Sequence, residues 1–334
     1  MRWKKLFWDD MCRGGALLHP GHSDAVPLQP TMKFFVKVPA TSANLGPGFD
    51  ALGLALDLWN ETKFTPADKF SLHIEGEGAN RLAPNQKNLI VRSMQKVYDA
   101  AGKQMSPVCI HCINRIPLAS GLGSSAAAII TGLLGANAML DNPLSSTDIL
   151  TLATEIEGHP DNVAPALMGG LVVSTMNESK VVARKIIGAQ HVVPLCVTIT
   201  LPDFNFPTKQ ARAALPKHIS MKDAVHNISR AVLVTEAFRN GDLDLLGKVM
   251  DDVLHQPYRL PLIPGAREAM DAAKKAGASA VALSGAGPSL IAFSAKQDAN
   301  IGEAMKQAFE SVGLSARVFE LGISEEGAKI EIKE

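Results

Sequence analysis

The sequence is poor in cysteine and in aromatic residues, and it has no excess of charge of either sign. Its 334 residues include four cysteines and 5% aromatic residues, and 33 basic side chains balance 33 acidic ones. A balanced charge argues against the basic surface that nucleic-acid-binding proteins carry. The sequence therefore predicts no nucleic-acid partner.

The few cysteines argue against a zinc or redox site. Cys109 and Cys112 have the Cys-x-x-Cys spacing, but the chain lacks the second cysteine pair of a typical zinc site. Both lie in a strand-like run, 108–113, and residues three apart on a strand point to opposite faces. We interpret them as thiols of a protein in the reducing cytoplasm.

Long hydrophobic runs are absent as well. No apolar stretch reaches the roughly 18 residues that a membrane helix needs, so we expect no membrane partner. Residues 1–31 have a basic start but no continuous apolar segment, which is not the pattern of a signal peptide. We expect a disordered N-terminal extension over 1–31, folding from Met32 onward, and a cytoplasmic location.

What the sequence does contain is a mixed pattern of helices and strands, long enough for two domains. In the first half, the predicted strands are 34–38, 63–74, 108–116 and 171–174, and the predicted helices are 88–101, 126–140 and 145–157. In the second half, the predicted strands are 192–200, 280–284, 289–294 and 316–321, and the predicted helices are 221–239, 243–254, 266–276 and 301–312. The second half has the element order of a ferredoxin-like domain, so we place the domain boundary near residue 188.

A glycine- and serine-rich segment before the helix at 126–140 predicts a phosphate-binding loop. Glycines let backbone N–H groups approach a ligand closely, and the helix N-terminus adds free N–H donors and partial positive charge. Together these features suit a triphosphate. The residues predicted to bind the triphosphate are Pro117, Leu118, Ala119, Ser120, Gly121, Leu122, Gly123, Ser124, Ser125, Ala126 and Ala127.

Two other nucleotide-binding loops do not fit this segment. No Gly-Lys-Ser/Thr follows, so it is not a Walker A loop. Gly121, Gly123 and Ala126 have the Gly-x-Gly-x-x-Ala spacing of a dinucleotide-binding fold. That fold needs a second strand ending in an acidic residue, whereas here a proline and another helix follow. The remaining alternative is a glycine-rich turn without a ligand.

The loop resembles the Gly-Leu-Gly-Ser-Ser-Ala signature of the GHMP kinases, a superfamily of galactose, homoserine, mevalonate and phosphomevalonate kinases. Segments 39–50 and 157–166 resemble motifs of its homoserine kinases, and 283–289 resembles the third superfamily motif. The resemblance implies an α+β fold with the active site in a cleft between two domains. They are a ribosomal-protein-S5-domain-2-like domain over 32–188 and a ferredoxin-like domain over 189–334.

The resemblance also implies an activity, a phosphotransferase reaction on an alcohol. A homoserine kinase uses ATP and Mg²⁺ to phosphorylate the side-chain hydroxyl of L-homoserine in threonine biosynthesis. The alternative is a GHMP kinase that acts on another small alcohol, such as mevalonate. Relatives are often homodimers, which leaves a homodimer as an option here.

Five residues are implied in substrate binding. By resemblance, Asn44 and Asp50 hold the amino group of homoserine, and His159, Arg212 and Arg259 hold its carboxylate. The chemistry agrees, because a carboxylate suits an ammonium group and an arginine fork suits a carboxylate. From the residues alone, Asn44 and Asp50 also fit an ordinary Asx-type turn.

The remaining implied residues surround the phosphoryl group that is transferred. Glu157 and Ser124 are expected to hold Mg²⁺, since hard cations prefer oxygen, with Glu155 as an alternative to Glu157. Asp161 and Asn162, placed in a loop after the helix, would lie beside the γ-phosphate and the attacking hydroxyl. Whether Asp161 acts as a base stays open, because phosphoryl transfer depends mainly on positioning and charge neutralisation.

Overall fold

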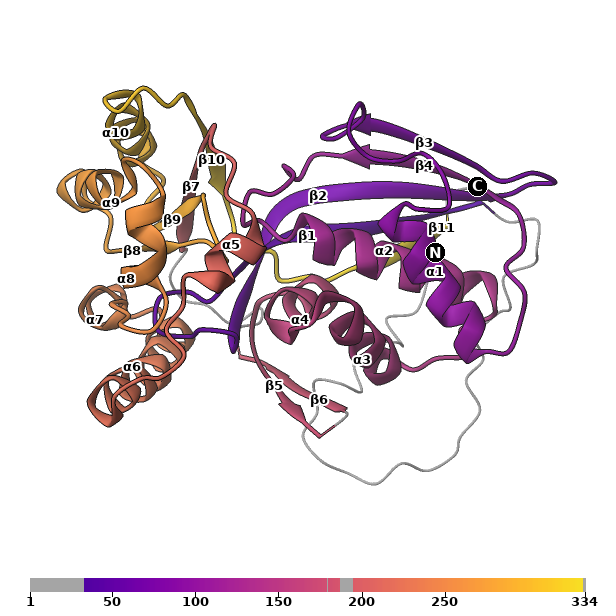
Figure 1. The fold of residues 1–334 in the computed structure, drawn as a ribbon, viewed down its shortest axis with the longest axis horizontal. Coiled ribbons are helices and arrows are strands. Elements are labelled where there is room, and N and C mark those ends of the chain that lie inside the picture. Colours follow the sequence, from indigo (N-terminus) through magenta and orange to yellow (C-terminus); the bar gives the residue numbers. More distant parts are fainter. Residues whose placement is uncertain (1–32, 179, 187–194, 333–334) are drawn as a thin grey trace.

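The computed structural model describes residues 33–178, 180–186 and 195–332 (Figure 1). The predicted extension over 1–31 and the domain boundary near 188 lie outside the described residues. Among the helices described, none combines the length and the apolar character that crossing a membrane requires. Two sheets with their helices account for the described chain, in agreement with the predicted α+β class.

The larger sheet has seven strands and carries most of the cavity described below. Its central path runs β11-β1-β2-β4-β3, with β5 paired to β2 and β6 paired to β5. Every pair is antiparallel except β3 with β4, which is parallel. The strands are β1 (Phe34–Ala43), β2 (Leu52–Pro66), β3 (Ser71–Gly76), β4 (Val108–Asn114), β5 (Leu171–Asn177), β6 (Lys180–Lys185) and β11 (Lys329–Ile332).

Four helices gather on one side of this sheet (Figure 1): α1 (Leu89–Ala100), α2 (Ser124–Met139), α3 (Ser146–Glu157) and α4 (Pro160–Met168). After its first two serines, helix α2 is apolar on nearly all sides, as expected of a helix that its neighbours bury. Two glycines allow this close packing. A Cβ atom would lie 2.2 Å from the Ile90 carbonyl oxygen at Gly132, and 2.4 Å from the Phe64 ring at Gly135.

The smaller sheet is antiparallel with the order β10-β7-β9-β8. Its strands are β7 (Cys196–Pro202), β8 (Ala280–Leu283), β9 (Leu290–Ser294) and β10 (Ala316–Leu321). Its helices are α5 (Thr208–Ala213), α6 (Met221–Asn240), α7 (Leu243–Val249), α8 (Gln256–Arg259), α9 (Ala266–Lys275) and α10 (Ala299–Glu310), and a 3₁₀ turn, Leu260–Leu262, follows α8. This connectivity is the split βαβ arrangement predicted for a ferredoxin-like domain.

The last strand described belongs to the other sheet. Strand β11 runs antiparallel to β1, with Phe34 opposite Ile332 and Lys37 opposite Lys329. The chain therefore returns from the smaller sheet to the edge of the larger one. The domain limits of 32–188 and 189–334 stay a prediction. The pairing of β11 with β1 means that the chain passes between the two sheets a second time, near its C-terminal end.

Several predicted elements differ from the structure. The helix expected over 243–254 ends at Val249, because the Asp252 carboxylate accepts hydrogen bonds from the backbone N–H groups of Leu254, His255 and Gln256 at 2.6 to 2.9 Å. The single strand expected over 63–74 is interrupted after Pro66. Strands β6 and β11 and helix α4 were not predicted.

Candidate active site

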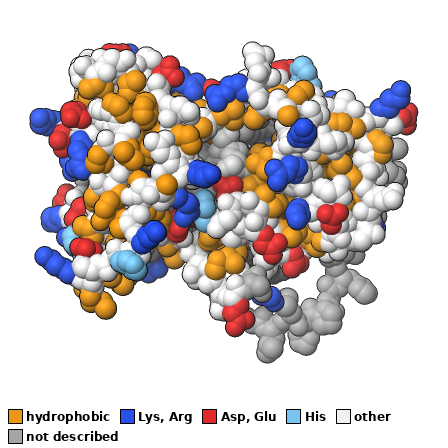
Figure 2. Space-filling model, in the orientation of Figure 1, with side chains coloured by type: hydrophobic (Ala, Val, Ile, Leu, Met, Phe, Trp, Pro, Cys, Tyr) orange, Lys and Arg blue, Asp and Glu red, His pale blue; other side chains and the backbone are white. Residues whose placement is uncertain are grey.

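A cavity of about 540 Å³ lies between the part of the chain built on the larger sheet and the part built on the smaller sheet. We call these parts the larger and the smaller domain. In Figure 2 the surface is hollowed near the middle of the view, with charged side chains of both signs around the hollow. Residues that line it from the smaller domain are Thr208, Arg212, Arg259, Gly285, Ala286 and Gly287. Those that line it from the larger domain and concern its chemistry are Asn44, Asp50, Leu118, Ala119, Ser120, Gly121, Gly123, Ser124, Ser125, Glu157, His159, Asp161 and Asn162.

The predicted phosphate loop follows a backbone path that requires glycine. Gly121 and Gly123 have φ angles of 81° and 69°, in the left-handed region that side chains other than glycine rarely adopt. A Cβ atom at Gly123 would lie 1.9 Å from the Thr41 hydroxyl oxygen, and one at Gly121 would lie 2.2 Å from the Ser284 carbonyl oxygen. Space and conformation thus both select glycine, and the loop backbone itself forms the wall of the cavity.

Helix α2 opens directly from this loop. Its N-cap is Gly123, so no side chain caps the N–H groups of its first turn. Ser124 and Ser125, the first two residues of α2, line the cavity. An uncapped helix N-terminus at a cavity has the free N–H donors and partial positive charge that suit an anion such as phosphate.

The serines of the loop have different tasks. The Ser120 hydroxyl donates to the Pro117 carbonyl oxygen at 2.8 Å and accepts from the Leu122 N–H at 3.2 Å, which holds the bend. The Ser125 hydroxyl donates to the Glu157 carboxylate at 2.6 Å. Of the predicted segment, Pro117, Leu122, Ala126 and Ala127 do not line the cavity.

Glu157 is the last residue of α3 and points into the cavity beside Ser125. Burial raises the pKa of its carboxyl group, and the hydrogen bond from Ser125 opposes this. Glu155 is exposed and does not line the cavity. Between the two predicted glutamates, the geometry therefore favours Glu157 as a ligand of a cation.

The third glycine motif closes over the phosphate loop. The Ser284 hydroxyl donates to the Gly121 carbonyl oxygen at 2.8 Å, and the Gly285 N–H donates to the Ala43 carbonyl oxygen at 3.0 Å. The Asn44 side-chain amide also donates to the Gly285 carbonyl oxygen, at 2.7 Å. Three segments far apart in sequence are thereby fixed at one end of the cavity.

Asn44 and Asp50 lie on the same turn, as predicted. The Asn44 side-chain oxygen accepts from the Asp50 N–H at 3.0 Å, and both residues have positive φ angles, 70° and 53°. Both polar atoms of the Asn44 amide are therefore engaged within the protein. The Asp50 carboxylate is bound by Arg212 through two contacts, of 3.1 and 3.0 Å.

Arg259 lines the same cavity as the Asp50–Arg212 pair but is buried, with an exposed fraction of 2%. Its guanidinium lies 5.2 Å from the centre of the Phe49 ring, on which Arg212 also rests at 6.0 Å. Burial, together with the positive charge of Arg212, lowers the pKa of Arg259 to about 10. The Phe49 ring thus holds two guanidinium groups beside the cavity, where their positive charge would attract an anionic group.

A buried histidine, which sequence reasoning missed, holds Arg259. One guanidinium N–H donates to His255 Nδ1 at 3.3 Å, because arginine has no acceptor atom. His255 Nε2 must then carry the proton that it donates to the Gly46 carbonyl oxygen at 2.8 Å. Burial lowers the pKa of His255, in keeping with a neutral ring. The i, i+4 spacing of His255 and Arg259 was the available signal.

Asp161 and Asn162 lie in the first turn of α4, so their predicted placement in a loop was wrong. Pro160 occupies the first helical turn, where its missing N–H costs nothing. Asp161 is 1% exposed and hydrogen-bonds to His159 Nδ1. Burial disfavours the charged imidazole, but the hydrogen bond and charge of Asp161, with the charge of Glu157, raise the pKa of His159.

The Asn162 side chain connects this turn to β1. Its oxygen accepts from the Thr41 hydroxyl at 2.8 Å. Its amide nitrogen lies 3.4 Å from the Asp161 carboxylate. All eight predicted substrate-binding and catalytic side chains, namely Asn44, Asp50, Glu157, His159, Asp161, Asn162, Arg212 and Arg259, line the one cavity.

A glycine loop at a helix N-terminus, facing a charged pocket between an S5-like and a ferredoxin-like domain, defines a small-molecule kinase of the GHMP class. Family models bear this out: "GHMP kinases N terminal domain" matches residues 88–170, and "GHMP kinases C terminal" matches residues 234–311. The predicted fold class is thereby confirmed. Within that class, the chain belongs to the homoserine kinase family.

The relatives support that membership over most of the chain. A homoserine kinase of Moorella thermoacetica is 45% identical over 296 residues, which cover 88% of this chain and 99% of that protein. A homoserine kinase of Carboxydothermus hydrogenoformans is 44% identical over 294 residues, which cover 88% of this chain and 95% of that protein. A crystal structure of homoserine kinase from Cytophaga hutchinsonii has a TM-score of 0.80 at 32% identity, covering 91% of this chain and 98% of that one.

Proposed function

We propose that the protein transfers the γ-phosphoryl group of ATP to the side-chain hydroxyl of L-homoserine, giving O-phospho-L-homoserine and ADP. One observation carries the proposal. A single cavity is lined by the uncapped N-terminus of α2 and also by the Asp50 carboxylate with three basic groups, those of His159, Arg212 and Arg259. The first suits a triphosphate, and the second suits an α-amino acid.

The Asp50–Arg212 pair is the basis of the proposed amino-acid recognition. An α-amino acid carries an ammonium and a carboxylate group on one carbon atom. Its ammonium group can replace Arg212 at Asp50, and its carboxylate can replace Asp50 at Arg212. Arg259 and His159 then add positive charge around the carboxylate. Mevalonate has a carboxylate but no ammonium group, so Asp50 distinguishes the two candidate substrates.

The cavity also suits Mg²⁺. A partly buried carboxylate whose pKa is raised by loss of contact with water gains from a nearby cation, and Glu157 is such a group. Glu157 and the hydroxyls of Ser124 and Ser125 are hard oxygen donors, as Mg²⁺ prefers. When bound, Mg²⁺ supplies charge neutralisation to the triphosphate.

The transfer step needs positioning more than it needs a strong base. The homoserine hydroxyl oxygen forms a bond to the γ-phosphorus as the bond from that phosphorus to ADP breaks. We assign Asn162 and Asp161 to orienting the hydroxyl and excluding water. Asp161 already accepts a hydrogen bond from His159, so we assign it no proton transfer. The hydroxyl proton passes to an oxygen of the transferred phosphoryl group.

A coupled assay of ADP formation tests the proposal. The full chain is supplied with MgATP and, in parallel, with L-homoserine, L-serine, mevalonate or galactose. We expect ADP formation above background with L-homoserine and the highest kcat/KM for that compound. ADP formation with mevalonate instead would favour the other GHMP activity, and no ADP with any alcohol would reject catalysis.

A further inference from the structure

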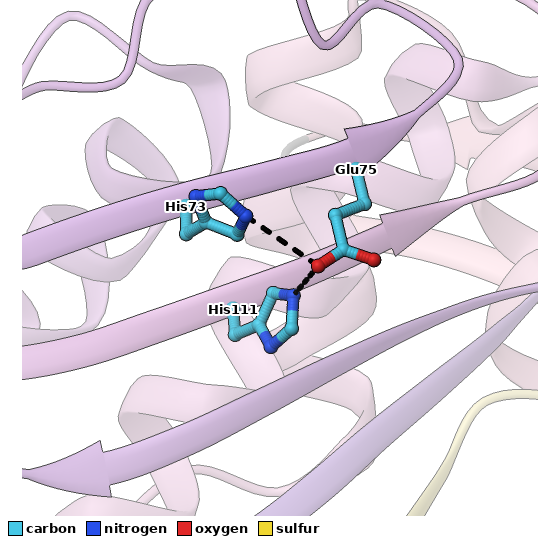
Figure 3. A group of neighbouring side chains, drawn as sticks. All are labelled: His73, Glu75 and His111. Atoms are coloured by element: carbon cyan, nitrogen blue, oxygen red, sulfur yellow. Dashed lines mark hydrogen bonds and ion pairs between the residues drawn. The ribbon is translucent and has the colours of Figure 1, made fainter.

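Two histidines and a glutamate form a cluster on the outer face of the larger sheet, away from the cavity. The Glu75 carboxylate oxygen Oε1 lies 2.8 Å from His111 Nε2 and 3.4 Å from His73 Nε2 (Figure 3). All three ligand atoms lie within 4.8 Å of one another. Among the residues that the structure describes, this is the one group of three or more such side chains.

The sheet fixes the cluster through its backbone. Strands β3 and β4 are parallel, and His73 is the register partner of His111. Glu75 lies two residues after His73 and so points to the same face. The intervening Ile74 points to the opposite face, where it lines the cavity with Cys112. Strand pairing therefore sets the face of the sheet and the backbone positions from which all three side chains project.

The 3.4 Å between Glu75 Oε1 and His73 Nε2 is the separation of two ligands of one metal ion, whereas the 2.8 Å between Glu75 Oε1 and His111 Nε2 is a hydrogen bond that a metal ion would replace by moving the two atoms roughly half an ångström apart. Zn²⁺ binds histidine nitrogen and carboxylate oxygen at about 2.0 to 2.2 Å, so two ligands at a tetrahedral angle lie about 3.3 to 3.5 Å apart. Histidine and carboxylate together favour Zn²⁺, Ni²⁺ or Cu²⁺ over Mg²⁺ or Ca²⁺, which prefer oxygen alone. We propose that His73, His111 and Glu75 bind a zinc-like divalent cation, with water completing its coordination.

Nearby groups do not prevent access. The side chain of His73 is 69% exposed and that of Glu75 is 52% exposed, so a metal can reach both from solution. Lys63 on β2 is the register partner of His111, and its positive charge opposes metal binding. The Lys63→Gln variant is therefore expected to bind the metal more tightly than the unaltered protein.

The site has a structural consequence, since β3 is an edge strand of the sheet. A metal bound to residues of β3 and β4 connects the two strands from the face opposite the cavity. Ligands that bind only the folded state raise its stability. Zn²⁺ is thus expected to raise the melting temperature without taking part in phosphoryl transfer.

Isothermal titration calorimetry of the chelator-treated full chain with ZnCl₂ tests the proposal. We expect a binding event that disappears in the His73→Ala/His111→Ala double variant and weakens at least about tenfold in Glu75→Gln. The matched control is His218→Ala, which removes an exposed histidine elsewhere and is expected to bind Zn²⁺ unchanged. The cluster variants and the unaltered protein share every histidine outside the cluster, and the His218→Ala control shows what loss of one such histidine does, so the difference reports the cluster.

Two further measurements keep the result interpretable. Unchanged homoserine-dependent ADP formation in the double variant, assayed with MgATP, would show that it folds. Co²⁺ in place of Zn²⁺ reports coordination directly, since a tetrahedral Co²⁺ site absorbs visible light strongly. Equal Zn²⁺ affinity and equal Co²⁺ spectra in the unaltered chain and the folded double variant would overturn the proposal.

Discussion

The Arg212 guanidinium binds the Asp50 carboxylate through two parallel N–H···O contacts of 3.1 and 3.0 Å, although the residues are 162 positions apart. Both side chains are partly exposed and line the cavity. An exposed pair of this kind adds little to stability. Its value lies in binding, because it has the charge pattern that an amino-acid substrate must match.

Replacing Asp50 by Asn tests that relationship. Asp50→Asn keeps the size of the side chain but removes the charge that would bind an ammonium group. A hydrogen bond to a charged group contributes about 1.5 to 3 kcal/mol, so KM for L-homoserine is expected to rise about 10- to 150-fold. Steady-state kinetics measure this, with KM for ATP as an internal control. The matched variant Asp99→Asn, on an exposed helix face, is expected to leave both constants unchanged. An unaltered KM for L-homoserine in Asp50→Asn would contradict the proposed role.

The pH dependence of homoserine binding follows from His159. Its pKa is raised from the usual 6.5, chiefly because the hydrogen bond and charge of Asp161 outweigh the effect of burial. The charged form is therefore fully present below the usual pKa and is lost as pH rises through the raised value. We expect kcat/KM for L-homoserine to fall over that range.

A variant separates this effect from other titrations. In His159→Gln the fall assigned to His159 is expected to disappear, and the remaining pH profile reports the substrate and other groups. KM for ATP, measured across the same pH range, serves as the control. If kcat/KM for L-homoserine fell equally with rising pH in both proteins, the proposed role of His159 in binding the carboxylate would be wrong.

Glu157→Gln is expected to separate activity from stability. Burial raises the pKa of Glu157, so the ionised form is disfavoured in the folded protein, and a neutral Gln avoids that cost. We expect an equal or higher melting temperature, a kcat at least about 100-fold lower and a weaker response to Mg²⁺. The control is Glu155→Gln, on the exposed side of the same helix. An equal loss of kcat in Glu155→Gln and Glu157→Gln would contradict the assignment of the Mg²⁺ ligand to Glu157.

Gly123→Ala is expected to destroy the phosphate loop. The added Cβ would lie 1.9 Å from the Thr41 hydroxyl oxygen, at a residue whose φ is +69°. Gly102→Ala is a matched control, since its φ is +64° and no atom lies within 4 Å of the added Cβ. The control should lose only about 1 kcal/mol of stability from backbone strain.

Calorimetric titration with an ATP analogue and thermal melts distinguish the two variants. Gly123→Ala is expected to lose nucleotide binding, whereas Gly102→Ala keeps it. If both variants bound the analogue as the unaltered protein does, the loop would not be the phosphate site.

Local sequence signals predicted much of this structure. The capping box of Ser145 and Asp148 begins α3 as expected, and the glycine loop precedes α2 as expected. The phosphate loop was predictable because its chemistry lies in consecutive residues. Helix α4 was missed because Gly158 and Pro160 resemble a helix-breaking loop, although proline is favoured in a first helical turn.

Other parts of the site depend on contacts between distant residues. The Asp50–Arg212 pair and the closure of Ser284 over Gly121 join segments more than 160 residues apart. The His73–Glu75–His111 cluster depends on the register of a parallel strand pair, which alternation alone does not specify. Residue type indicated the chemistry of each group, but only tertiary structure determines which groups meet.

The pairing of β11 with β1 has a consequence for synthesis on the ribosome. Until Lys329–Ile332 have left the exit tunnel, the β1 residues Phe34–Lys37 keep one row of backbone hydrogen-bonding groups uncovered. Uncovered strand edges recruit other chains and promote aggregation. We therefore expect a chain that has not yet paired β11 with β1 to be more prone to aggregation than the folded protein, although its phosphate loop has already been translated.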